Sequence, residues 1–180
     1  MSKPHIKLFI PGPVEVYPEA FLATCSPLIG HRSGDFKKLY ATLQPKLQKL
    51  FYTHDPVYLM TSSAWGAMEA AIRNSVRPDK KLLCLSNGAF SDKWFEVAES
   101  CGIRAEYLMW DWGRPVDPAK VKEKLAEGNF DAITFVHNET SIGLANPIRE
   151  IMAAVREFPD VVSIVDTVSS FGAQEINKDG

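Results

Sequence analysis

Four short polar segments each follow an apolar stretch of the chain, and they hold the residue types that could do chemistry. The first is residues 61–66, where hydroxyl and small side chains lead into an expected helix. Free amides and the helix dipole at such a start suit a phosphate group, although an ordinary serine N-cap explains the same residues. The sequence has neither a Walker loop nor a GxGxxG motif, which argues against nucleotide binding.

The second and third segments are residues 86–91 and 137–143. An Asn-Gly turn precedes Phe90, whose ring either covers a flat cofactor or belongs to the core. In the third segment, five polar residues follow an apolar run, and burying them is costly unless partners satisfy them. This pattern favours a binding site over a plain turn.

The fourth segment begins at Asp166, which directly follows an apolar run. Its carboxylate is expected to be partly desolvated, so that it needs a cation or several hydrogen-bond donors. An N-cap and a magnesium ligand are alternative roles, and Asp166 alone does not decide between them.

The elements that must position these segments alternate along the chain. Apolar runs predict strands over residues 57–60, 81–85, 105–108, 132–136 and 161–165. Helices are predicted over 18–28, 35–51, 65–76, 91–101, 117–126 and 147–158, with a kink or break at Pro45. Strands that are apolar throughout are buried on both faces, so the pattern predicts an α/β fold with a mostly parallel sheet and helices on both faces. In such sheets ligands bind beyond the carboxyl ends of the strands.

Composition excludes several classes of protein. The 180 residues include 20 Lys+Arg and 22 Asp+Glu, and a net charge of −2 gives no electrostatic case for nucleic acid or an acidic membrane. No apolar run is long enough to span a bilayer, and the start of the chain lacks a signal-peptide core. The three cysteines form no CxxC pair, and the four histidines have no metal-ligand spacing. We therefore expect a cytoplasmic protein without a metal.

Together the polar segments resemble class V aminotransferases, which are pyridoxal-phosphate enzymes of fold type I, and in particular the alanine–glyoxylate, serine–pyruvate and serine–glyoxylate group. The segments that carry the resemblance occur in family order across nearly the whole chain: PGPVEV, GHRSGDF, the small-residue helix start before Trp65, NGAFSDKW, HNETSIG and VDTVSSFG.

The resemblance implies a set of cofactor-binding residues. The phosphate would be held by the helix start at Ser63, Ala64 and Trp65, and the pyridine ring would be stacked by Phe90. Family members often have glycines at positions 62 and 64, His at 65, and Trp or Tyr at 90.

The resemblance implies further contacts as well. Thr140 would lie near the phenolic oxygen of the ring, and Asp166 would pair with the pyridine nitrogen, which keeps that nitrogen protonated. Gly12 would approach the substrate. His31 and Arg32 match a family signature without an assigned role.

The resemblance also implies a Schiff-base lysine some two dozen residues after Asp166. Lys178 is the only lysine after that aspartate, and it precedes the strand on which the family carries the lysine. We therefore expect no catalytic residue within this chain, which would be inactive alone. The expected organisation is an N-terminal segment near the active site over residues 1–30 and a large cofactor-binding domain, incomplete at its C-terminal end, over residues 31–180.

The implied reaction moves an amino group from a small amino acid, alanine or serine, to a 2-oxo acid, glyoxylate or pyruvate, in a homodimer. Two alternatives stay open. One is a cysteine desulfurase or lyase of the same class, and the other is a non-catalytic α/β protein that binds a phosphate ligand.

Overall fold

The computed structural model describes residues 5–174, and the chain divides into two compact units, Met1–Leu59 and Met60–Gly180. The first unit holds two helices, α1 (Pro18–Ala23) and α2 (Gly34–Leu50). Ser33 caps α2, because its hydroxyl oxygen accepts the Phe36 amide at 3.1 Å. The expected break at Pro45 does not occur: α2 continues for five residues beyond it, since proline removes only one of the helix's hydrogen bonds. The helix expected over 18–28 ends early, at Ala23.

The strand expected over residues 57–60 is not formed. The backbone of Val57 instead bonds a side chain of α2. The side-chain amide of Gln44 donates to the Val57 carbonyl at 2.8 Å, and the Val57 amide donates to Gln44 Oε1 at 3.1 Å. Tyr58 is 82% exposed. An apolar run forms a strand only when another strand pairs with it, and no strand among the described residues does so here.

The second unit is built on a four-stranded sheet in the order β2-β1-β3-β6, and every pair is parallel. The strands are β1 (Lys81–Ser86), β2 (Ala105–Met109), β3 (Phe130–Val136) and β6 (Val162–Asp166). Helices α3 (Ala64–Ser75), α4 (Ala89–Ser100), α5 (Pro118–Ala126) and α6 (Ile148–Val155) alternate with the strands. The predicted parallel α/β arrangement is confirmed. A hairpin of β4 (Asn138–Glu139) and β5 (Leu144–Ala145) was not predicted.

Side chains of the sheet alternate between two apolar layers. Leu83 and Leu85 of β1 pack in the layer that α5 and α6 cover, while Leu82 and Cys84 pack in the layer that α3 and α4 cover. Phe135 is fully buried in the first layer. Covering both faces is what holds a parallel sheet in place. Among the described residues, no helix combines the length and the apolar character needed to cross a bilayer.

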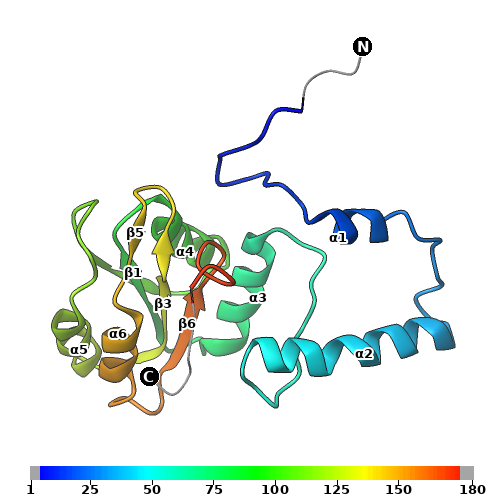
Figure 1. Cartoon of the computed structure of the whole chain (residues 1–180). Coiled ribbons are helices and arrows are strands. Elements are labelled where there is room, and N and C mark those ends of the chain that lie inside the picture. The colour runs from blue at the N-terminus through cyan, green and yellow to red at the C-terminus, as the bar shows by residue number, and fades with distance from the viewer. Residues whose placement is uncertain (1–4, 175–180) are drawn as a thin grey trace. The chain divides into compact units, whose positions relative to one another are not determined.

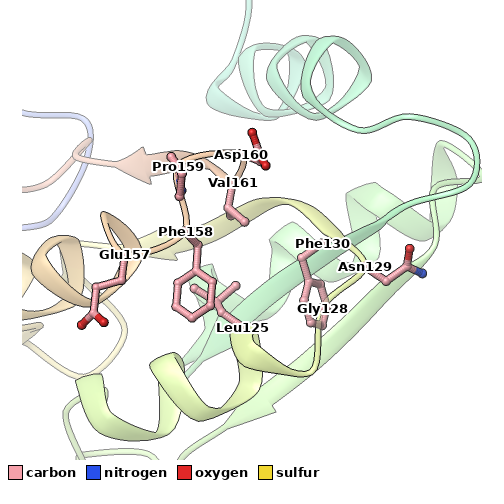
Figure 2. A pocket seen from close by; sticks show the side chains of 9 residues that line it. All are labelled: Leu125, Gly128, Asn129, Phe130, Glu157, Phe158, Pro159, Asp160 and Val161. Carbon is pink, nitrogen blue, oxygen red and sulfur yellow. The ribbon is translucent and has the colours of Figure 1, made fainter.

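Because the strands are parallel, their carboxyl ends share one edge of the sheet. Figure 1 shows β3 and β6 pointing toward the same side, where the N-terminal end of α3 also lies. At the opposite edge, a hollow of about 210 Å³ lies between the end of α5 and the starts of β3 and β6. Figure 2 shows the ring of Phe158 beside Leu125 in this hollow, with Asn129 and Asp160 near its rim.

A buried carboxylate fastens this opposite edge. Asp131 near the start of β3 accepts two hydrogen bonds from the Arg77 guanidinium, at 2.8 and 2.6 Å, and a third from the Arg77 amide at 3.0 Å. This bidentate pair links the segment that follows α3 to the sheet. The Arg77 guanidinium lowers the pKa of Asp131 to about 2.

We predict that Asp131→Asn, which removes the ion pair with Arg77, lowers the free energy of unfolding by about 1–2 kcal/mol at neutral pH. The loss is modest because water screens the exposed guanidinium. Folding lowers this pKa, so the pair stabilises the fold above the ordinary carboxyl pKa of 3.8 and loses that effect as the pH falls toward 2. Urea unfolding between pH 7 and pH 2.5 measures both the loss of stability at neutral pH and its dependence on pH. A variant whose stability falls with acid as steeply as that of the unmodified chain would contradict the assignment.

Candidate active site

All four polar segments of the sequence reach the carboxyl edge of the sheet within the second unit. Asp166 at the end of β6 lies in register with Val136 at the end of β3, and the His137 amide donates to the Asp166 carbonyl at 2.9 Å. The last residue of β1, Ser86, leads directly into the start of α4. The topology therefore gathers the segments that the sequence separates by up to about a hundred residues.

The Asp166 carboxylate is half-buried, and no cation of the described residues pairs with it. Its Oδ1 accepts the Val168 amide at 2.9 Å. Burial raises the pKa of Asp166, and the negative charge of Glu139 adds to that rise, while the Val168 amide opposes it. The arrangement leaves a desolvated acid whose ionised form is favoured when a positive group approaches.

The start of α3 leaves backbone donors open. The Ser63 side chain does not cap the helix, and the Gly66 amide turns back to the Ser63 carbonyl at 3.1 Å. The amides of Ala64 and Trp65 meet no acceptor among the described residues. The Trp65 side chain packs against the α3–α4 layer. The ordinary serine N-cap is therefore not formed, and the helix start keeps open backbone donors.

Phe90 lies in the first turn of α4 with 40% of its surface exposed. A core aromatic would be enclosed, so the exposed ring is compatible with covering a flat ligand. The backbone around it is held tightly: the Phe90 amide donates to Glu139 Oε1 at 3.3 Å. Thr140 follows Glu139 in the chain, and its hydroxyl bonds that of Ser169, which joins the segments after β3 and β6.

Glu139 is a residue of the site that the sequence reasoning left without a role. Its side chain is fully buried, and it accepts the Ser91 amide at 2.8 Å and the Ser141 hydroxyl at 2.7 Å. Burial raises the pKa of Glu139, but the Ser141 hydroxyl and the amides of Ser91, Ser141 and Phe90 outweigh burial and leave the pKa below its ordinary value. The available signal was the glutamate within a polar run after a buried strand, but its partners on α4, Phe90 and Ser91, are 49 and 48 residues away.

A second polar cluster was also missed. Asn87 is buried and donates to the Asn146 side chain at 2.8 Å and to the Arg114 carbonyl at 3.0 Å. Asn146 in turn donates to the Val136 carbonyl at 2.8 Å and accepts the Val116 amide at 3.0 Å. The side chains of Asn87 and Asn146 thus connect the ends of β1 and β3 by hydrogen bonds.

The sequence analysis also singled out Gly12, His31 and Arg32. These residues belong to the first unit, and what was expected of them stays a prediction. Lys178 lies outside the described residues. Within residues 5–174, no group of three or more His, Cys, Asp or Glu side chains is placed to hold a metal ion.

Comparison with known proteins places this edge in a family context. The family model described as class V aminotransferase matches residues 17–179. An uncharacterized aminotransferase of Methanocaldococcus jannaschii is 39% identical over 173 residues, which is 96% of this chain and 45% of that protein. An L-aspartate–glyoxylate aminotransferase of Paracoccus denitrificans is 33% identical over 96% of this chain and 45% of its own length.

Solved structures agree. An alanine–glyoxylate aminotransferase of Nostoc sp. superposes with a TM-score of 0.89 at 27% identity, over 99% of this chain and 48% of that one. The chain thus spans about half the length of the curated relatives it matches. The expected fold, that of fold type I aminotransferases, is confirmed.

The tight packing around Glu139 yields a prediction. A Cβ built on Gly88 would lie 2.4 Å from Glu139 Cγ and 2.8 Å from Ser141 Oγ. We therefore expect Gly88→Ala to displace the buried glutamate and to lower the free energy of unfolding by about 1–3 kcal/mol. Chemical denaturation measures the change.

Gly34→Ala is the matched control, because Gly34 also lies at a helix start but a Cβ there meets nothing within 4 Å. Its stability should be unchanged or slightly higher, since alanine is the better helix former. Equal stability of the two variants would contradict the close packing at Gly88.

Proposed function

Because the chain belongs to the class V aminotransferase family, we propose that its carboxyl edge holds pyridoxal phosphate in an enzyme that transfers amino groups. The observation that carries the proposal is the half-buried Asp166 carboxylate, which meets no cation among the described residues. A desolvated acid needs a positive partner, and the protonated ring nitrogen of the cofactor is one.

The other predicted residues complement this acid. The open amides of Ala64 and Trp65 at the start of α3 suit the phosphate group. The exposed ring of Phe90 is available to stack on the pyridine, and the Thr140 hydroxyl to hydrogen-bond the phenolic oxygen.

Bound pyridoxal phosphate supplies an electron sink for the negative charge that develops at the substrate α-carbon. The protein's part is electrostatic and steric. The carboxylate of Asp166 would favour a proton on the ring nitrogen. The amides of Ala64 and Trp65 would hold the phosphate, Phe90 would shield the ring from water, and the Thr140 hydroxyl would hydrogen-bond the phenolic oxygen.

For the substrates, we propose a small amino acid, alanine or serine, as donor and a 2-oxo acid, glyoxylate or pyruvate, as acceptor. Glyoxylate is named for both the Paracoccus denitrificans relative and the Nostoc structure, while their donors, aspartate and alanine, differ. We also propose that the enzyme works as a homodimer. Exposed apolar side chains in the first unit, such as Ile6, Phe9 and Leu28, support an interface there.

Asp166→Asn tests the cofactor site. We expect roughly tenfold or greater loss of affinity for pyridoxamine phosphate, the amine form of the cofactor, which cannot react with surface lysines. Titration followed by tryptophan fluorescence measures it. The raised pKa means that ionised Asp166 opposes folding above its ordinary pKa, so the variant's melting temperature without cofactor should be unchanged or higher at pH 7.

Asp160→Asn is the matched control, since it makes the same substitution just before the same strand at the opposite edge. It should bind pyridoxamine phosphate as tightly as the unmodified chain. If Asp166→Asn bound equally tightly, the placement of the ring nitrogen would be wrong.

The substrate pair is tested by amino transfer. The protein that carries this segment is expected to form glycine from glyoxylate faster with alanine or serine than with aspartate, as measured by chromatography. Preference for aspartate would contradict the proposed donor, and absence of glycine with every donor would contradict the acceptor.

A further inference from the structure

The first turn of α4 is capped by a distant hairpin rather than by the residues that precede it. The Ala89 amide donates to Ser141 Oγ at 3.1 Å, and the next two amides, of Phe90 and Ser91, donate to the Glu139 carboxylate at 3.3 and 2.8 Å. Three of the four open donors of this helix start are therefore satisfied from residues 139–141, and the fourth, the Gly88 amide, donates to Ser91 Oγ at 2.9 Å.

The carboxylate is suited to this place. It is fully buried, it is an acceptor only, and it lies at the positive end of the α4 dipole. Its Oε1 also accepts the hydroxyl and amide of Ser141 at 2.7 and 3.2 Å, so both of its oxygens are used. The side chain packs closely against Gly88, where an added Cβ would lie 2.4 Å from Glu139 Cγ.

Glu139 thereby connects two residues of the proposed site that belong to different segments. Through the α4 amides it holds the backbone of Phe90, and through the chain it is bonded to Thr140. We propose that Glu139 is a positioning residue that sets the place of the Phe90 ring relative to Thr140, and so the spacing between the two groups that would cover and orient the cofactor ring. The inference rests on the proposed function, since it concerns the same site.

Glu139→Gln tests the inference with nearly unchanged size. The glutamine amide places an N–H group against backbone N–H donors, which leaves at least one of the amides of Phe90 and Ser91 without an acceptor. We expect roughly tenfold weaker binding of pyridoxamine phosphate. In the cofactor-free chain, we expect hydrogen exchange of these two amides to become at least roughly tenfold faster.

A double-mutant cycle with Phe90→Ala separates positioning from general destabilisation. If Glu139 acts through Phe90, Glu139→Gln should cost little further affinity once the ring is absent. An equal loss in both backgrounds, or no loss in either, would overturn the inference. If Glu139→Gln does not fold, Ser141→Ala removes one bond to the carboxylate and should show a smaller loss with the same dependence on Phe90.

Asp131→Asn is the matched control, because Asp131 is also a buried carboxylate that accepts a backbone amide, but at the opposite edge. It should lower stability while leaving the affinity for pyridoxamine phosphate within twofold. An equal affinity loss in Asp131→Asn would make the effect of Glu139 merely structural and overturn the inference. Failure of the unmodified chain to bind would overturn the proposed function itself, a result distinct from tight binding that Glu139→Gln leaves unchanged.

Discussion

The parallel direction of four strands is the constraint on which the rest of the second unit depends. It brings the segments after β1, β3 and β6 to one edge, and α3, the helix that precedes β1, starts on the same side. Both faces of such a sheet must be covered, so the apolar layers under α3–α4 and α5–α6 follow from the same constraint. Polar side chains therefore lie at the edge, where the chain leaves the ends of the strands.

Three acids of this unit show how differently a carboxylate can be accommodated. Asp131 is paired with a guanidinium, and Glu139 is enclosed by amides and a hydroxyl; both have a lowered pKa. Asp166 has one amide and a like-charged neighbour, and its pKa is raised. The first two are satisfied by groups of the protein itself, whereas the third keeps a raised pKa, a property that clusters at functional positions.

Local sequence patterns predicted the elements of the second unit well, because apolar runs and helical spacing report burial directly. They failed at residues 57–60, where strand formation needs a pairing partner that the pattern does not contain, and at Pro45, where one lost hydrogen bond did not end a helix. The polar segments were predicted to lie at the carboxyl ends of the strands, and the topology brings them there. The contacts of Glu139 with α4 were not predicted, since Phe90 and Ser91 are distant in sequence and only the topology brings them to it.

The remote cap on α4 has a consequence for the order of assembly. During synthesis the helix emerges from the ribosome before β3 and the hairpin do, and so before any acceptor exists for its first three amides. Its first turn therefore stays frayed until about fifty more residues have been made and β3 has docked beside β1. The backbone of Phe90 therefore becomes fixed only after β3 and the hairpin have formed, although α4 itself is made well before them.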